Sequence, residues 1–379
     1  MDYPYFIFYL LLILLAFLCW RTKEKRFANC AFVVAFVFFG LRAPVVGADT
    51  WDYVRYLTGE RNFYNYDPRP LEPLFIVYRE ILNYLTDSRA VVMVVNTIVT
   101  FAPLYYICKK YSLNPPLTIL FFCFLGGMFI YFVGLRQMIA LAVLYIALIY
   151  CVENEGGLWK KVGVFLICTF VAYFFHTSSV LYSLIILVAL LPFPTSRLMY
   201  LFLVVGSALI GIVLAKFNVL DFFSIILGLE FSSVERLDGY LENEELNDTV
   251  PISILLRFTV FSLVAYFFID KEKLSHPFPK IFLAEVIMYN LLYSVPMSHR
   301  LCYPLSFFGA VVLTWAKGKS AHTFVTHKYL KFVIILLVLY YLRSQAIDLS
   351  TWKRTDEGRM HPYYFVFEDY RDHPSITNF

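Results

Sequence analysis

The chain has 379 residues, of which 60% are hydrophobic and only 16% charged, and its mean hydropathy is +0.67. These values lie far from those of soluble globular domains, so we predict a polytopic integral membrane protein. The net charge of +4 is small and the basic residues fall in short loops, which argues against nucleic-acid binding.

The apolar stretches predict an all-α chain with about twelve transmembrane helices, because a helix needs roughly 20 mainly apolar residues to cross the bilayer. The first run lacks a basic start and ends in Trp20 and Arg21, so we expect a retained span and not a cleaved signal. The shorter run 73–85 carries Arg79 and Glu80, which predicts an amphipathic or re-entrant helix at the membrane interface. The predicted spans are 4–20, 27–43, 89–107, 116–133, 137–151, 161–176, 178–193, 198–214, 251–269, 280–297, 301–316 and 329–343.

Lys and Arg gather in alternate loops, as the positive-inside rule requires of cytoplasmic loops. Both termini are then outside the cytoplasm. We predict one transmembrane domain, 1–343, with extracytoplasmic loops near 44–88 and 215–250, and an extracytoplasmic tail, 344–379. Within the second loop, the apolar run 222–231 precedes an acidic segment, which either caps an outward cavity or is a charged surface loop.

Ionisable residues gather at the extracytoplasmic ends of the predicted spans, where they are costly and usually functional. Arg136, His176 and the pair His299-Arg300 each lie in a short turn between two apolar runs. Arg at such a turn suits bidentate recognition of phosphate, and His176 can accept a proton or donate to a phosphate oxygen. The alternatives are an Arg136 that snorkels to the interface and a His176 that is structural.

Carboxylates stand beside these turns. Asp49 and Asp52 follow Arg42 at the end of the second span, and Glu72 lies between two prolines that stiffen the chain. A rigid, partly desolvated carboxylate can act as a general base towards a hydroxyl group. Alternatively, Asp49 caps a short helix or pairs with Arg42, and Glu72 only begins the helix that follows it.

A further cation, Arg257, lies inside the ninth span and needs a partner or a wet cavity. Glu285 in the tenth span is the predicted partner. The pair is either structural or part of the outward site.

Common catalytic and metal-binding patterns are absent from the sequence. There is no Walker A, G-x-G-x-x-G, H-E-x-x-H or G-x-S-x-G motif, which leaves nucleotide hydrolysis, zinc proteolysis and serine hydrolysis without support. The seven cysteines lack zinc-finger or C-x-x-C spacing and lie mostly in apolar runs, so we expect them to be packing residues.

Taken together, these segments resemble the Wzy-type polysaccharide polymerases, specifically the EpsG-like branch. Ala48 stands where Thr is expected in a Gly-Thr-Asp pattern, which leaves Asp49 in place. The matching elements are Gly40-Leu-Arg, Gly47-Ala-Asp-Thr, Tyr53, Glu72-Pro-Leu-Phe75, Leu135-Arg-Gln-Met-Ile-Ala140, Phe175-His-Thr-Ser178 and Arg300 before Tyr303.

The resemblance implies a bacterial inner-membrane glycosyltransferase of GT-C-like organisation. Such enzymes join undecaprenyl-pyrophosphate-linked oligosaccharide repeats at the extracytoplasmic face and release undecaprenyl pyrophosphate. Besides membrane lipids, it implies a chain-length regulator and a flippase of the same pathway as partners. We expect no cofactor and no metal, because pyrophosphate leaves readily and no dense carboxylate cluster is present.

Physical argument and resemblance together divide the expected site by role. The predicted catalytic residues are Asp49, Glu72, His176, Arg136 and Arg300. The predicted pyrophosphate-binding residues are Arg42, Arg136, Arg257, His299 and Arg300. The predicted sugar-binding residues are Asp52, Tyr53 and Gln137.

Two alternatives remain at this point. A flippase or transporter would bind a lipid-linked or anionic solute with the same Arg residues and break no bond, although the absence of internal repeats argues against it. A transferase resembling an O-antigen ligase, or a membrane acyltransferase, would differ in its acceptor.

Overall fold

In the computed structural model, several helices begin at a residue whose side chain caps the first turn. Ser88 precedes α5 (Arg89–Tyr111) and Asn114 precedes α6 (Pro115–Phe122), and each side chain accepts a hydrogen bond from the backbone N–H three residues later. Such caps satisfy N–H groups that the first helical turn leaves without partners. Pro115 supports the start of α6 in the same way, because its ring presets a helical backbone angle and it has no N–H to satisfy.

The structure describes residues 3–24, 26–47, 49–60, 71–192, 195–215, 252–292, 299–315 and 363–369, without the side chains of 158, 252–257, 299 and 300. Within these ranges the chain is helical and forms no strand, which confirms the predicted fold class. The other elements, in chain order, are α1 (Tyr3–Thr22), α2 (Phe27–Gly40), α3 (Thr50–Leu57), α4 (Pro73–Leu85), η2 (Cys123–Gly127), α7 (Met128–Val133), α8 (Leu135–Glu153), α9 (Leu158–Tyr173), α10 (Ser179–Leu190), α11 (Arg197–Leu214), α14 (Ile252–Phe268), η3 (Lys271–Ser275), α15 (Pro277–Leu292), α16 (His299–Cys302), η4 (Tyr303–Leu305) and α17 (Ser306–Thr314).

The predicted spans from 4–20 to 301–316 each overlap a helix or a run of joined helices within the described residues. The last predicted span, 329–343, and the apolar run 222–231 lie outside the described residues. Among the described helices, five stretches are long and apolar enough to cross a membrane. The total of about twelve spans stays a prediction.

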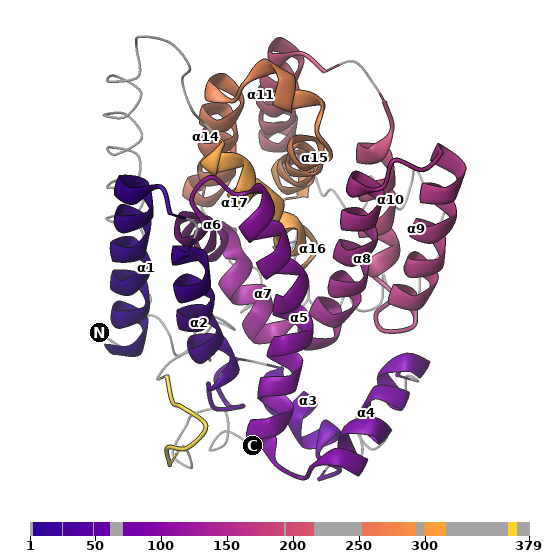
Figure 1. The fold of residues 1–379 in the computed structure, drawn as a ribbon. Helices are drawn as coiled ribbons and strands as arrows, with labels where there is room; N and C mark the ends of the chain where they lie inside the picture. The colour runs from indigo at the N-terminus through magenta and orange to yellow at the C-terminus, as the bar shows by residue number, and fades with distance from the viewer. Residues whose placement is uncertain are drawn as a thin grey trace.

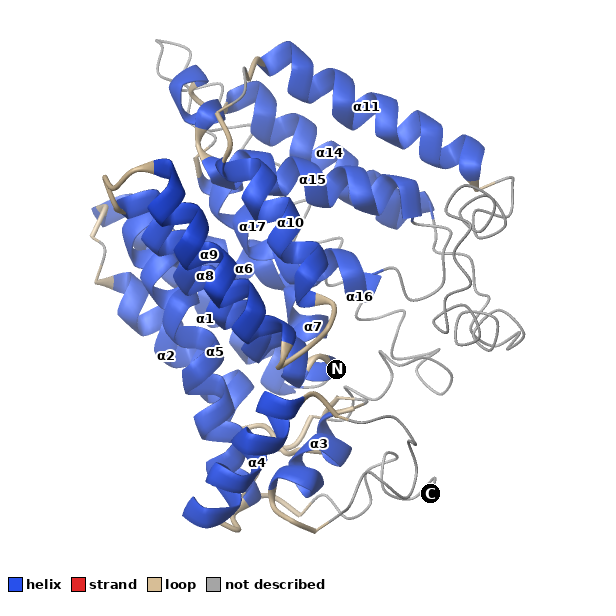
Figure 2. Cartoon of the chain, turned by 90° about the vertical axis from the view of Figure 1, so that its right-hand side faces the viewer, coloured by secondary structure: helices blue, strands red, loops and turns tan. Residues whose placement is uncertain are grey.

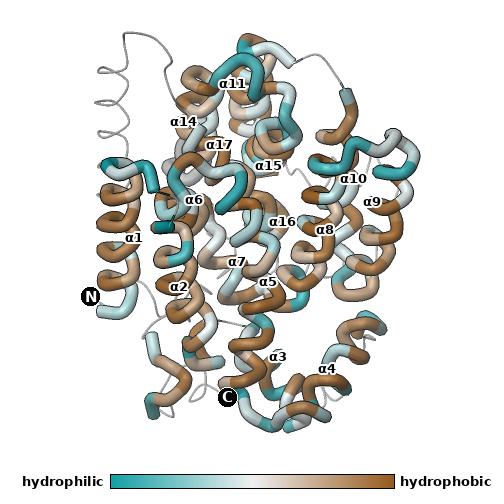
Figure 3. Tube along the Cα trace, in the orientation of Figure 1, coloured by the Kyte–Doolittle hydropathy of each residue, from teal (hydrophilic) through white to brown (hydrophobic). Residues whose placement is uncertain are grey.

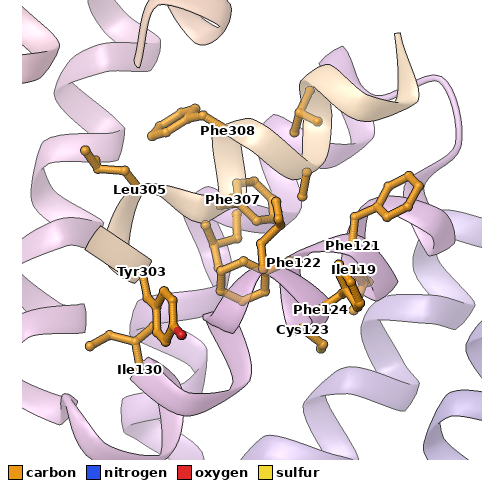
Figure 4. Packing of buried hydrophobic residues seen from close by; sticks show 14 of the residues in the cluster. Ile119, Phe121, Phe122, Cys123, Phe124, Ile130, Tyr303, Leu305, Phe307 and Phe308 are labelled. Carbon is orange, nitrogen blue, oxygen red and sulfur yellow. The ribbon is translucent and has the colours of Figure 1, made fainter. Parts of the chain in front are cut away.

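The centre of the bundle is the continuous stretch formed by α6, η2 and α7, which is buried along its whole length (Figure 1). It bends at Gly126, where the backbone has a φ of 97°. A Cβ atom at this position would lie 2.5 Å from Cγ of Tyr303, so only glycine allows η4 to pack so closely. Around the bend, the rings of Phe122 and Phe307 meet edge to face with centroids 5.4 Å apart (Figure 4).

Peripheral helices expose large apolar side chains. Leu10 on α1, Ile167 and Phe170 on α9, and Phe202 on α11 are each at least half exposed. Exposed apolar side chains of this size are unfavourable in water and are suited to lipid. The helices that carry them are hydrophobic along most of their length (Figure 3). The chain is therefore a membrane-embedded protein.

The two ends of the bundle differ. α3 and α4 lie together beyond one end, which also holds the turn between α9 and α10 (Figures 1 and 2). The lysine-bearing turns are the last turn of α5, with Lys109 and Lys110, and the first turn of α9, with Lys160 and Lys161. They lie at the opposite end, where the trace is strongly hydrophilic (Figure 3). α4 confirms the helix predicted at 73–85, and its outer face exposes Val77, Ile81 and Tyr84.

Candidate functional site

The loop that follows α2 folds around the guanidinium group of Arg42. Nε donates to the carbonyl oxygen of Val46 at 3.2 Å and Nη1 to that of Phe39 at 2.7 Å. Nη2 donates to Thr50 Oγ1 at 3.3 Å and to the carbonyl oxygen of Tyr131 at 3.0 Å. The Arg42 side chain is 2% exposed, so it joins this loop to α7 from within the protein. This geometry favours a structural role for Arg42 over the predicted contact with pyrophosphate.

Gly47 lets the same loop lie directly against the end of α7. Its φ is 119°, and an added Cβ atom would come within 2.0 Å of the carbonyl oxygen of Phe132. Thr50 at the start of α3 also donates its hydroxyl hydrogen to this carbonyl. These contacts place α3 next to Gly134, which separates α7 from α8.

The described C-terminal segment 363–369 packs on the other side of the loop. The Ala43 N–H donates to the carbonyl oxygen of Tyr364, and the Val366 N–H donates to that of Leu41, each at 2.8 Å. The Tyr363 hydroxyl donates to the carbonyl oxygen of Phe38. This part of the tail thus lies at the same end of the bundle as α3 and α4 (Figure 1).

Arg136 is the centre of a polar cluster at this end. It lies in the first turn of α8, and its Nη1 forms an ion pair with Oε2 of Glu72 at 2.5 Å. Its Nε and Nη2 donate to the Tyr53 hydroxyl at 3.1 and 2.9 Å. The guanidinium carbon also lies 5.0 Å from the ring centroid of Tyr53 and 5.7 Å from that of Phe75. Three elements, α3, α4 and α8, therefore meet at one partly exposed cation.

Neighbouring charges act on the pKa of the Tyr53 hydroxyl. Burial raises the pKa of its hydroxyl, Arg136 lowers it, and the negative charges of Asp49 and Glu72 raise it further, with a raised pKa as the result. Asp49 occupies the N-cap position of α3, as the sequence suggested, although its side chain makes no capping hydrogen bond. Asp52 lies half-buried in the first turn of α3.

His176 lies in the turn between α9 and α10, which adjoins the start of α4. The Leu74 N–H donates to the carbonyl oxygen of Phe174 at 3.1 Å and joins the two segments. Burial, followed by the positive charge of Arg136, lowers the pKa of the imidazole to about 4, and the charge of Glu72 opposes this shift. His176 therefore belongs to the same cluster as Arg136 and Glu72, and it is neutral at pH 7.

Polar neighbours hold the ring of His176. Its Nδ1 lies 3.2 Å from the backbone N of Ser178 and 2.8 Å from the Ser178 Oγ. Gln137 is buried beside them, and its amide nitrogen lies 3.4 Å from Ser178 Oγ and 2.5 Å from the Tyr182 hydroxyl. These contacts favour a supporting role for Gln137 over the predicted contact with sugar.

The side chains of Arg257, His299 and Arg300 lie outside the described residues, although their backbones belong to α14 and α16. The Tyr145 hydroxyl joins α8 to the carbonyl oxygen of Pro304, which directly follows α16 and Tyr303. Glu285 is fully buried in α15, and its predicted pairing with Arg257 stays a prediction.

Sequence reasoning missed the supporting residues of the cluster. Phe75 packs edge to face on Tyr53 with centroids 6.0 Å apart, and Tyr182 accepts the Gln137 amide. Neither has a local signal, because each meets its partner through the tertiary fold. Ser178 did carry a signal, since a short hydroxyl residue two positions after a His at a helix start commonly bonds locally.

Among the described residues, no group of three His, Cys, Asp or Glu side chains is arranged to hold a metal ion. A sequence model of the EpsG family matches residues 25–363 of the chain. The searches of curated proteins and of solved structures found no match.

Proposed function

The chain belongs to the EpsG family, and we propose that it is a membrane glycosyltransferase that polymerises oligosaccharide repeats carried on undecaprenyl pyrophosphate. Family membership by itself implies the coarser role of a polysaccharide polymerase-like protein in a membrane. The donor, the acceptor and the released lipid pyrophosphate belong to the proposal.

The observation that carries the proposal is the environment of Arg136. Its ion pair with Glu72 and its bonds to Tyr53 occupy one N–H on each of Nε, Nη1 and Nη2. A guanidinium has five such donors, so within the described part of the chain one remains on Nη1 and one on Nη2, and both can donate to oxygens of a phosphate. The group is 20% exposed and lies at the N-terminus of α8, where the helix dipole also favours an anion.

The proposed reaction breaks the bond between the anomeric carbon of the donor sugar and the pyrophosphate oxygen. The bond electrons leave with the lipid pyrophosphate, and a hydroxyl oxygen of the acceptor repeat bonds to the anomeric carbon. Arg136 binds the pyrophosphate and stabilises the charge that develops as it departs. The proton of the attacking hydroxyl passes to a carboxylate, Glu72 or Asp49.

The ion pair between Arg136 and Glu72 places the proposed base beside the proposed pyrophosphate contact. A pyrophosphate that binds the two remaining N–H groups of Arg136 shares this guanidinium with Glu72. The same side chain would thereby orient the carboxylate that accepts the proton and bind the group that leaves.

We further propose that α3, α4 and the cluster face the extracytoplasmic side of a bacterial inner membrane, with both termini on that side. The position of the lysine-bearing turns at the other end supports this orientation. Arg300 and His299, on α16, are proposed as further pyrophosphate contacts, and Arg257 as a third. A flippase and a chain-length regulator of the same pathway are the proposed partners.

The test uses the purified full chain in lipid vesicles, supplied with the lipid-linked repeat of the host. Oligomer ladders and released undecaprenyl pyrophosphate are measured for the wild type and for Arg136→Ala. The matched control is Arg89→Ala, since Arg89 also pairs with a carboxylate, Glu60, near the same end but outside the cluster. We expect Arg136→Ala to lose at least 100-fold in rate and Arg89→Ala to stay within about threefold.

Intact substrate and no ladder from folded wild-type protein would overturn the polymerase proposal. Transfer of the intact lipid across the vesicle would then identify a flippase. Transfer of the glycan to a different lipid acceptor would identify a ligase.

A further inference from the structure

The hydrogen bonds around His176 determine which ring nitrogen carries the proton. A backbone N–H can only donate, and that of Ser178 points at Nδ1 from 3.2 Å. Nδ1 must therefore offer a lone pair. In a neutral imidazole the single N–H is then on Nε2.

The side-chain contacts agree with this direction. The amide nitrogen of Gln137 can only donate, and it lies 3.4 Å from Ser178 Oγ. The hydroxyl oxygen of Ser178 is thus used as an acceptor, and its hydrogen is available for Nδ1 at 2.8 Å. Gln137 thus donates to Ser178, and Ser178 donates to Nδ1 of His176.

The charge state of His176 is consistent with this tautomer. Burial and the nearby guanidinium of Arg136 hold the pKa of His176 near 4, and Glu72 is the carboxylate that opposes them. Because the imidazole is neutral near pH 7, its Nε2 keeps the N–H. Within the described part of the chain, Nε2 has no hydrogen-bond partner.

We propose that His176 acts as a neutral hydrogen-bond donor, whose Nε2–H binds a pyrophosphate oxygen beside Arg136, and that Ser178 and Gln137 are positioning residues that hold the tautomer. This proposal rests on the proposed function, and of the two roles expected from the sequence it takes donation to a phosphate oxygen over acceptance of a proton. The proton stays on Nε2 throughout. The hydrogen bond strengthens as negative charge develops on the leaving oxygen, so it favours the transition state over the ground state.

The first test measures the tautomer without requiring activity. The full chain, with ¹⁵N-labelled histidine, is placed in lipid vesicles, and the ring nitrogens are observed by NMR, with His176→Gln used to assign the signals. Near pH 7 we expect an unprotonated Nδ1 and a protonated Nε2. The opposite tautomer, or an imidazolium, would overturn the proposal.

The second test compares His176→Gln with His176→Asn. A glutamine amide reaches the place of Nε2, whereas an asparagine amide reaches only that of Nδ1. We expect the glutamine variant to be about tenfold faster in polymer formation than the asparagine variant, the effect of one hydrogen bond to a charged group. Equal rates, or a faster asparagine variant, would refute the donor role.

Ser178→Ala tests the positioning residue. We expect kcat to fall several-fold with little change in KM, and the NMR signals of His176 to show a mixture of tautomers. The matched control is Ser183→Ala, because Ser183 lies on α10, which begins directly after Ser178, and among the described residues its hydroxyl bonds only the carbonyl oxygen of Ser179. A Ser178→Ala variant that matches the control in both measurements would contradict the positioning role.

The two proposals can fail separately. If the wild type forms polymer but the glutamine variant has no advantage, only the donor role is lost. If the wild type forms no polymer, the proposed function fails and the pyrophosphate contact fails with it, while NMR still decides the tautomer.

Discussion

Replacement of Arg42 by Lys keeps the charge but removes the planar group that reaches four oxygens. The guanidinium donates to three backbone carbonyls and to Thr50 from a site that is 2% exposed. An ammonium group on this stem can face two of these acceptors at once, so at least two hydrogen bonds to a charged donor are lost, each worth about 1.5 kcal/mol or more. The expected loss of folding free energy is about 3 kcal/mol.

That loss translates into a modest but measurable thermal shift. An unfolding entropy of about 2.1 cal/mol/K per residue gives roughly 0.8 kcal/mol/K for 379 residues, so the Tm should fall by about 4 °C. Thermal unfolding in detergent measures this shift, and the vesicle assay measures the rate per folded molecule, which should stay within about threefold of wild type. Arg136→Lys should show the converse, a nearly unchanged Tm and a rate at least 100-fold lower.

An unchanged Tm for Arg42→Lys, together with a 100-fold loss of rate, would refute the structural role. Arg42 would then return to the pyrophosphate-binding residues. A control at Arg89→Lys should change neither quantity, because that ion pair lies at the surface.

Three further predictions follow from the cluster. Gly47→Ala should lower the free energy of unfolding by more than about 2 kcal/mol, because its φ of 119° and the carbonyl of Phe132 leave no room for a methyl group. A Tm within about 1 °C of wild type would contradict this. Tyr53→Phe should slow polymer formation about tenfold without unfolding the chain, because two N–H groups of Arg136 lose their acceptor. An unaltered rate would show that Tyr53 does not orient the guanidinium. His176 should contribute no ionisation to the profile of kcat/KM between about pH 5.5 and 8, because its pKa is lowered to about 4. Because this pKa is lower in the folded chain than in the unfolded chain, the unfolded chain binds the proton of His176 more tightly. The Tm of the wild type should therefore fall relative to that of His176→Gln as pH decreases from about 6.5 towards 4. The same dependence of Tm on pH in both proteins would contradict the lowered pKa.

Local patterns were sufficient to predict most of the helices. Length and continuous hydrophobicity mark a span wherever they occur, and the amphipathic pattern of 73–85 correctly predicted α4. The alternation of basic loops also predicted which helix ends would share one side, and Arg136, Glu72 and His176 do meet at one end of the bundle. These features depend on residues close in the chain, so they could be recognised without a structure.

The individual roles depended on contacts between distant residues. Arg42 and Arg136 both follow a Gly-Leu pair at the end of an apolar run, and both were predicted to bind pyrophosphate. In the fold, Arg42 is enclosed by its own loop and α7, whereas Arg136 keeps a partly exposed guanidinium that pairs with Glu72. The packing of α3 and α4 against α8 makes this difference, and nothing within a few residues of either Arg encodes it.

The same distinction applies to His176. Its place in a turn between two apolar runs follows from hydrophobicity along the chain, and this place made it a candidate site residue. Its neutral charge and the proton on Nε2 follow from burial, from the charge of Arg136 and from the donors Ser178 and Gln137. Hydropathy is a property of a segment and can be read from sequence, whereas charge state and hydrogen-bond direction belong to an assembled environment and exist only in the folded protein.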